Sequence, residues 1–205
     1  MIKPLALAGL LALSSPVFAG IYTGTGGSIP DLDTLTRDIV VTDSFTITDV
    51  NITLTNLTHD FIGDLIASIQ KLSGPSVDLF NRVGRTGGIG VGDGSILGGD
   101  YSFDDAATGN LWATADGLGS SQTIPSGAYY PTTGGGALSF LSAFNGLDAA
   151  GTWRLTISDN QGADSGALGG WTLNLQGAAV PEPATLALFA LGGLLLSRRR
   201  SFFRE

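Results

Sequence analysis

The chain has 205 residues and no cysteine, which excludes disulfide bonds and thiolate metal sites. Glycine is abundant at 31 residues but follows no Gly-X-Y period, which excludes collagen, and 43% apolar residues suffice for a packed core. Residues 20–179 contain five Lys or Arg against sixteen Asp, and the resulting net charge of −11 excludes nucleic acid as a partner through repulsion. Such an acidic surface suits divalent cations or basic partners, or simply keeps an exported protein soluble.

The N-terminus has the features of a secretory signal peptide. Lys3 precedes an apolar run at Pro4–Leu13, and Val17-Phe18-Ala19 places small residues at the −3 and −1 positions. The run is shorter than the ~20 residues that a membrane-spanning anchor needs. We therefore predict a signal peptide at residues 1–19, cleaved after Ala19 by signal peptidase.

The middle of the chain, residues 20–179, shows period-two patterns that indicate strands rather than helices. Val50–Thr55 alternates apolar and polar residues. Trp153–Ile157 and Trp171–Leu175 share one design, a Trp followed by aliphatic residues at every second position. Clusters of Gly, Pro, Asn and Asp separate these runs and favour tight turns. We therefore predict an all-β domain, an antiparallel β-sandwich or jelly roll, with no amphipathic helix of useful length.

Three stretches of this domain, Leu57–Pro75, Phe103–Ala106 and Phe144–Leu173, carry motifs in a distinctive order and spacing. They resemble the P domain (P/Homo B domain) of proprotein convertases and related bacterial subtilisin-like proteases. The resemblance covers about residues 30–177 and departs at Gly74, where the family usually continues a Ser-Pro loop. It implies a jelly-roll β-sandwich or barrel of about eight strands.

We predict that the chain is not an enzyme. In the convertases the P domain follows a catalytic domain and stabilises it, but only about ten residues here separate the signal peptide from the P-like region. A subtilisin-type set of Asp, His and Ser needs a large α/β scaffold. The one histidine, His59, could in principle be a general base, because the reference pKa of histidine lies near neutrality, but we expect a structural residue bonded to backbone or to an Asp.

Three Asp-bearing loops in the P-like motifs are candidate ligands for calcium (Ca2+), because hard cations take several oxygen ligands from loops. We expect these loops to meet at one end of the jelly roll, although the same residues could instead cap turns. The Gly-rich stretch Gly84–Gly99 lacks the context of a nucleotide-binding loop and is interpreted as a loop between strands. The six candidate ligands are Asp60, Asp64, Asp104, Asp105, Asp159 and Asp164.

The C-terminal residues 180–205 have three parts. Pro181-Glu182-Pro183 comes first, an apolar stretch at about 184–197 follows, and Arg198-Arg199-Arg200 comes last. Proline is tolerated in the first turn of a helix, so a helix starting near Pro183 is expected. We predict a C-terminal transmembrane helix, with the arginines held in the cytoplasm.

These three parts resemble the PEP-CTERM sorting signal of Gram-negative bacteria. The resemblance implies recognition by an exosortase, a membrane-embedded cysteine peptidase that would cleave near the motif. The protein would first be anchored in the inner membrane and then released or re-anchored at the cell surface. A plain single-span anchor is the alternative.

Three hypotheses for function follow. The first is a non-catalytic surface module that binds or packs against an extracellular matrix, through polysaccharide or other surface proteins. The second is an accessory P domain that acts in trans with a subtilisin-like serine endopeptidase. The third is a polysaccharide-binding or hydrolysing jelly roll, for which the sixteen Asp single out no catalytic carboxylate pair.

Overall fold

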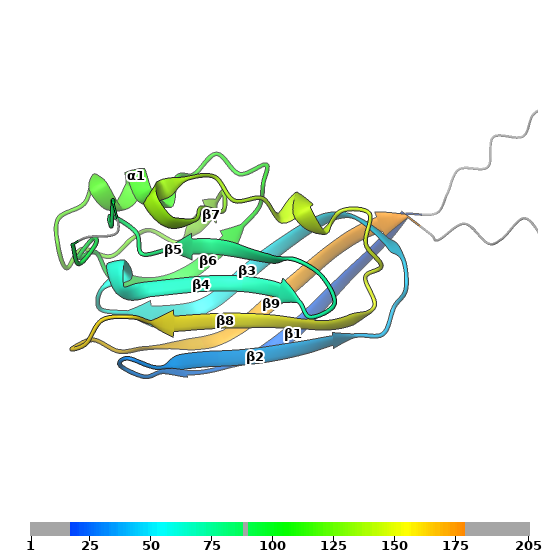
Figure 1. Cartoon of the computed structure of the whole chain (residues 1–205), viewed down its shortest axis with the longest axis horizontal. Helices are drawn as coiled ribbons and strands as arrows, with labels where there is room; N and C mark the ends of the chain where they lie inside the picture. The colour runs from blue at the N-terminus through cyan, green and yellow to red at the C-terminus, as the bar shows by residue number, and fades with distance from the viewer. Residues whose placement is uncertain (1–16, 88–89, 179–205) are drawn as a thin grey trace, which may run out of the picture.

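The computed structural model describes residues 17–87 and 90–178. Within these ranges nine strands form two packed β-sheets (Figure 1). The one α-helix there is six residues long. The predicted all-β fold is therefore confirmed, while the jelly-roll topology stays a prediction. In the described ranges no helix is both long and apolar enough to cross a membrane. The predicted transmembrane helix lies outside the described residues, as do the first sixteen residues of the predicted signal peptide.

The strands are β1 (Val17–Ile29), β2 (Thr34–Val41), β3 (Thr46–His59), β4 (Leu65–Lys71), β5 (Ser76–Asn81), β6 (Leu97–Phe103), β7 (Gly127–Tyr129), β8 (Gly151–Asp159) and β9 (Gly166–Ala178). The helix is α1 (Leu111–Asp116), and the short 3-10 helices are η1 (Ile62–Asp64), η2 (Gly134–Gly136) and η3 (Leu141–Phe144).

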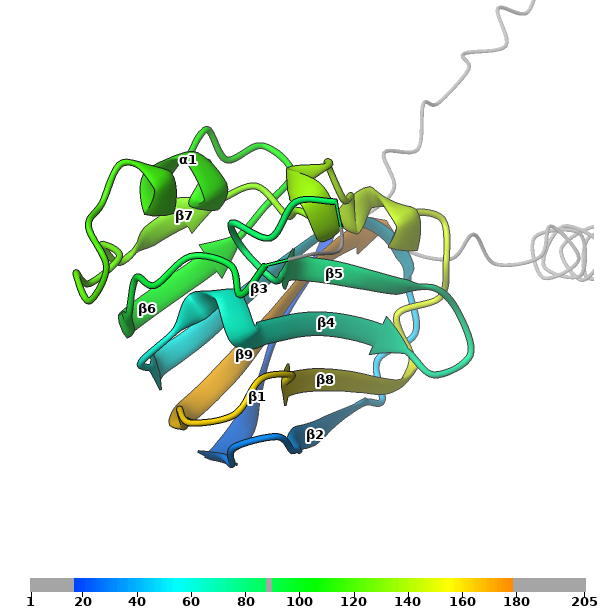
Figure 2. The same ribbon diagram turned by 60° about the vertical axis from the view of Figure 1, so that its left-hand side comes forward.

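The strands divide into two sheets that lie face to face. One sheet has the order β1-β9-β3-β6-β7, and the other has the order β2-β8-β4-β5. The pairing of β6 with β7 is parallel, and the other pairings between these strands are antiparallel. Figure 2 shows the two layers, with α1 beside β7 at one edge. The last strand, β9, therefore lies inside its sheet between β1 and β3.

Alternating side chains fill the space between the sheets. Trp153 from β8 and Trp171 from β9 are at most 1% exposed, so the repeated Trp design supplies one buried indole from each sheet. Nε1 of Trp153 donates to the carbonyl oxygen of Ala149 at 3.0 Å, and its ring centre lies 4.9 Å from that of Phe144. The two strands predicted from these tryptophans are thus confirmed as core strands.

The Trp171 ring depends on a glycine in the neighbouring strand. Gly24 of β1 pairs with Trp171 of β9, and a Cβ built on Gly24 would overlap Nε1 of the indole. A side chain at position 24 would therefore push the ring out of the core. This close approach explains a glycine inside a strand, where it is otherwise unfavourable.

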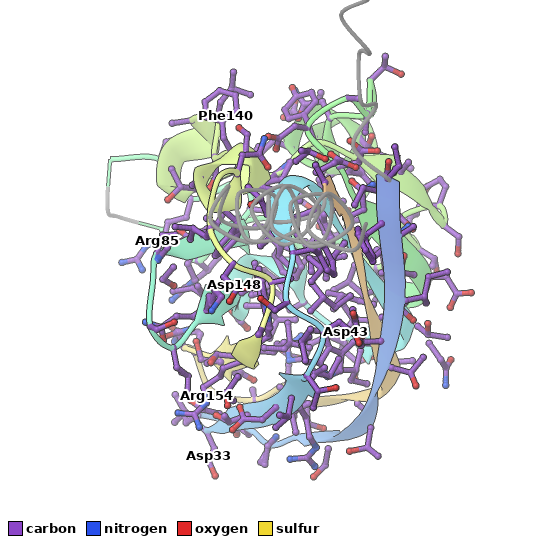
Figure 3. The ribbon with its side chains drawn as sticks, turned by 90° about the vertical axis from the view of Figure 1, so that its right-hand side faces the viewer. Asp33, Asp43, Arg85, Phe140, Asp148 and Arg154 are labelled. Carbon is purple, nitrogen blue, oxygen red and sulfur yellow. The ribbon has the colours of Figure 1, made fainter. Side chains whose placement is uncertain are left out.

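Both ends of the described chain leave the domain at the same end. Val17 at the start of β1 pairs with Ala178 at the end of β9 (Figure 1). Figure 3 looks onto this end, where Asp43 and Asp148 are labelled. The predicted cleavage point after Ala19 falls within β1 and stays a prediction.

Replacing Trp153 with Ala is expected to lower the free energy of unfolding by about 3–5 kcal/mol, because it removes a buried indole and leaves a cavity. Urea denaturation followed by circular dichroism measures the change. The neighbouring Arg154 points away from the core (Figure 3) and pairs with Asp38, so Arg154→Ala should change stability little. Equal losses in the two variants would contradict this account of the core.

Candidate functional site

Four polar side chains are buried together at the end of the sandwich opposite to the chain termini. His59, Asp64, Arg82 and Asp159 are each at most 6% exposed, and we call them the polar cluster. His59 ends β3 and Asp159 ends β8, while Asp64 ends η1 and Arg82 directly follows β5. Leu65, the first residue of β4, pairs with Asp159, which brings these strand ends together.

The imidazole of His59 is fully occupied by partners within the protein. Its Nε2 lies 3.2 Å from Oδ2 of Asp159, and neither side chain is exposed to solvent. Nδ1 lies 3.0 Å from the carbonyl oxygen of Phe61 and 3.2 Å from the backbone nitrogen of the same residue, so both ring nitrogens have partners within the protein. A general base must reach its substrate within hydrogen-bonding distance. This ring is closed off and bonds to backbone and to an Asp, as the structural interpretation of His59 predicts.

Arg82 ties the loops of the polar cluster together. Its Nε donates to the carbonyl oxygen of Gly63, and Nη1 donates to that of Asn160 at 3.2 Å. Nη2 lies 3.8 Å from Oδ1 of Asp64, at the outer limit of an ion pair. Burial lowers the pKa of Arg82, and the positive charge of Arg85 lowers it further. The guanidinium therefore acts chiefly as a buried cross-link between loop backbones.

Asp64 has less hydrogen bonding than its burial demands. Its side chain is 2% exposed, and Oδ1 has no hydrogen-bond partner. The pKa of Asp64 is raised to about 6, first by burial and then by the negative charge of Asp159, with Arg82 acting in the opposite direction. Two buried carboxylates thus share one buried arginine, and protonation of Asp64 relieves the imbalance.

The structure separates the six candidate calcium ligands into two groups. Asp64, Asp159 and Asp164 are electrostatic neighbours in the polar cluster region, and Asp60 follows directly after β3. The remaining two follow β6, whose last residue pairs with Ile52, seven residues from the end of β3. At about 3.3 Å per residue, this separates the two groups by roughly 23 Å. The loops therefore do not all meet at one end.

The second group has a local explanation. Oδ1 of Asp104 accepts from the backbone N–H of Ala106 at 2.7 Å. The two carboxylate oxygens of Asp105 accept from the N–H groups of Leu141 and Ser142, each at 2.8 Å, at the start of η3. These contacts fit the turn-capping alternative. Across residues 17–87 and 90–178, no three His or acidic side chains are grouped so that they could hold a metal ion.

Sequence analysis missed the part that Arg82 plays. The residue looked like one of five scattered cations, and only the strand order shows that it lies against two acidic loops. Its backbone has φ of 45°, in the left-handed region that a branched or long side chain seldom adopts. Its place directly after β5 could not be found in advance, because no strand was predicted at residues 76–81.

Comparison with protein families finds two matches. Residues 127–175 match the proprotein convertase P-domain, and residues 179–201 match the PEP-CTERM protein-sorting motif. Both predicted resemblances are therefore confirmed. The P-domain match runs from Gly127, the first residue of β7, to Leu175, three residues before the end of β9, and includes both core tryptophans.

Among curated proteins, none matches the chain. Among solved structures, the chain is similar to the serine protease of Aeromonas sobria in complex with a chaperone, at 13% identity and a TM-score of 0.47 over 80% of this chain and 28% of that one. It is also similar to the serine protease of Aeromonas sobria alone, at 14% identity and a TM-score of 0.44 over 79% and 27%. The chain thus spans under a third of these proteases.

The raised pKa of Asp64 predicts a specific pH dependence of stability. The folded state holds the carboxyl proton of Asp64 more tightly than the unfolded chain does. The contribution of this proton to the free energy of unfolding is therefore fully present below about pH 4 and is lost as pH rises through about 6. In Asp64→Asn this loss disappears. Between about pH 4 and 7, the free energy of unfolding of the variant should rise by up to about 3 kcal/mol relative to that of the wild type.

Urea denaturation at several pH values, compared between wild type and variant, measures this difference. Asp60→Asn changes an exposed Asp of the same loop and serves as the control, which should follow the wild-type profile. Parallel profiles for wild type and Asp64→Asn would show that Asp64 is ionised at the same pH in both states.

Proposed function

We propose that this chain is an exported protein, sorted by an exosortase, whose β domain is a non-catalytic binding or structural module at the cell surface. The observation that carries the proposal is the sorting motif, whose match starts at residue 179, directly after β9 ends at Ala178. The predicted apolar stretch then begins within about 20 Å of the domain, even if the intervening chain is fully extended. Before sorting, the end of the domain where β1 and β9 meet would therefore face the inner membrane.

The non-catalytic part of the proposal has two supports. The matched P-domain is a non-catalytic accessory domain of proteases, and the one histidine of the chain has both ring nitrogens occupied in a closed cluster. Ser-His chemistry requires a histidine that can take a proton from an exposed nucleophile. His59 does not meet this requirement.

Replacing Pro181, Glu182 and Pro183 with Ala is expected to block sorting, so that the full tail is kept and the protein stays in the membrane fraction. The physical reason is that recognition would lose the rigid, charged segment before the apolar helix. Cell fractionation and intact mass in a bacterium with an exosortase measure the outcome. Arg204→Ala, beyond the arginine triplet, is the matched control. A triple variant that is processed like the wild type would refute exosortase sorting through this motif.

A second candidate function is an accessory P domain acting in trans with a subtilisin-like serine endopeptidase. The match at residues 127–175 favours it, because a P domain stabilises the catalytic domain it packs against in the convertases. Mild cross-linking on whole cells, affinity capture and mass spectrometry distinguish the two functions. A subtilisin-like protease recovered with the chain would favour the accessory role; sorted surface proteins or polysaccharide without a protease would favour the matrix module.

Calcium binding is proposed for the loops around Asp64 and Asp159. The unpartnered Oδ1 of Asp64 supports it, because a buried acceptor without a donor could serve a cation. The residues fit only in part, since Nη2 of Arg82 lies 3.8 Å from this oxygen and a cation would have to displace it.

If calcium binds there, millimolar Ca2+ should raise the melting temperature while Mg2+ does not, because a ligand that binds only the folded state stabilises it. Thermal unfolding of the wild type and of Asp159→Asn tests this. The variant should lose the response. A melting temperature that is identical with Ca2+, with Mg2+ and with neither would remove calcium from the proposal.

A further inference from the structure

The start of β1 lies against the loop that joins β2 to β3. The hydroxyl of Tyr22 in β1 donates to Oδ2 of Asp43 in that loop at 2.7 Å. Asp43 is labelled in Figure 3, and the blue strand β1 runs past it. The pKa of Tyr22 is raised to about 12, first by burial and then by the hydrogen bond and the negative charge of Asp43. The phenol therefore stays protonated, and the second oxygen of the Asp43 carboxylate can accept from another donor.

The Tyr22 ring rests on the backbone of Gly20. The two residues face the same side of β1, because side chains alternate along a strand. A Cβ built on Gly20 would overlap the hydroxyl oxygen and the ring of Tyr22. Any other residue at position 20 would therefore push the phenol away from Asp43.

A surface pocket of about 340 Å³ lies at this contact. Predicted cleavage after Ala19 would remove two of the six residues that line it and would leave Gly20 as the first residue of the mature chain. The six residues are Phe18, Ala19, Tyr22, Asp43, Ser44 and Phe45.

This cleavage changes the chemistry of the Gly20 nitrogen. Water adds across the Ala19–Gly20 peptide bond, so the departing peptide keeps a carboxylate and Gly20 keeps an amine. At neutral pH most α-amino groups are protonated, because their ordinary pKa is about 7.7–8.0. A neutral amide with one N–H thus becomes an ammonium group with three N–H donors.

The geometry lets this ammonium group reach the Tyr22–Asp43 contact. A terminal residue is held only through its carbonyl carbon, so the Gly20 nitrogen can rotate about the Cα–C bond. A rotation of about 120° moves the nitrogen to the position of the built Cβ, because the substituents of a tetrahedral carbon are equivalent in space. That position is in contact with the Tyr22 hydroxyl oxygen. The Asp43 carboxylate then lies one hydrogen bond further on, within about 5 Å, where opposite charges favour each other.

The other groups at this end of the sandwich leave Asp43 as the partner. The part of β9 that pairs with Val17–Ile21 is Asn174–Ala178, which has no charged residue. On β3, Asp49 pairs with Gln176, one register position from the partner of Gly20, and so faces the opposite side of the sheet.

Two further charged groups belong to neighbouring elements. Asp148, in the loop before β8, accepts from the hydroxyl of Ser44 at 3.2 Å. Nζ of Lys71, at the end of β4, donates to the carbonyl oxygen of Ala150 at 2.7 Å and to Oγ of Ser73 at 3.1 Å. This cation is therefore directed to neutral oxygens, and Asp43 is left for the amine of Gly20.

We propose that the α-ammonium group of Gly20, created by cleavage after Ala19, binds at the Tyr22–Asp43 contact and pairs with the Asp43 carboxylate. The pair fastens the first residue of the mature chain to the loop between β2 and β3. The uncleaved chain has an amide at this place and cannot form the pair. This inference rests on the proposed export of the chain.

The test compares two forms of the otherwise full chain in detergent micelles, one beginning at Gly20 and one at Ala19. An initiator methionine placed before either small residue is removed by methionine aminopeptidase. The longer form moves the amine by one residue, about 3.3 Å. The rate of N-terminal acetylation at a series of pH values, read by mass spectrometry, gives the pKa of the amine. This readout is chosen because an exposed ion pair contributes little to stability.

In the chain that begins at Gly20, the pKa of the amine is expected to rise to about 8.5 or above, because Asp43 favours the charged form. The chain that begins at Ala19 should keep an ordinary pKa. Asp43→Asn should return the Gly20 amine to its ordinary pKa, and Asp148→Asn, the matched control at the same end, should not. Salt at 1 M should reduce the rise, because exposed charges are screened.

An ordinary pKa in the chain that begins at Gly20 would overturn the proposal. So would an equal rise in the two forms, or an equal fall in the two Asn variants, since either would show a general acidic field. The comparison of the two forms needs no substitution, so it holds even where a variant fails to fold.

Intact mass of the exported protein separates this inference from the proposed function. A first residue other than Gly20 would overturn the pair in the cell but leave export and sorting in place. A protein that keeps Met1 would remove export, and the proposed function with it. Mass that begins at Gly20, together with the raised pKa, supports both.

Discussion

The five-stranded sheet depends on β9, because this last strand supplies backbone partners to two neighbours at once. It pairs with β1 from Val17 to Ile29 and with β3 from Thr46 to His59. Without β9, β1 would have no partner in its sheet. The sheet therefore closes only when the first and last segments of the domain are both present. Folding is governed by contacts between residues far apart in sequence, which makes it slow compared with helical domains of the same size.

The opposite end of the sandwich is held by buried polar groups rather than by strand pairing alone. Burying a charge is costly unless it is paired, and a pair that loses one member leaves the other uncompensated. His59 and Asp159 satisfy each other, and Arg82 satisfies two loop carbonyl oxygens. Asp64 is the poorly matched member, and burial together with the negative charge of Asp159 raises its pKa to about 6. The cluster thus holds the loops in place, but it stabilises them less when Asp64 is ionised.

Sequence patterns could predict the strands with strict alternation, but they could not predict which loops lie next to one another in the fold. The Trp153 and Trp171 strands were identifiable because every second residue is aliphatic and buried. The separation of Asp104 from Asp159 could not be predicted, because the strand order decides which loops lie at the same end of the sandwich. In this order β6 lies beside β3 rather than β8. Helix α1 was also not expected; it is six residues long and begins where the Asn110 side chain accepts from the N–H of Ala113.

The pairing of Val17–Ala19 with Gln176–Ala178 gives export a structural consequence. If the chain is cut after Ala19, the mature β1 begins three residues later than the strand seen here, and β9 keeps β3 as its one neighbour at this corner. Phe45 also loses the Phe18 ring that stacks on it at 5.8 Å. Maturation at the N-terminus would therefore open one strand position and one aromatic surface immediately before the C-terminal sorting motif. The two ends of this polypeptide would in that way be linked: removing one leaves a vacant edge beside the other.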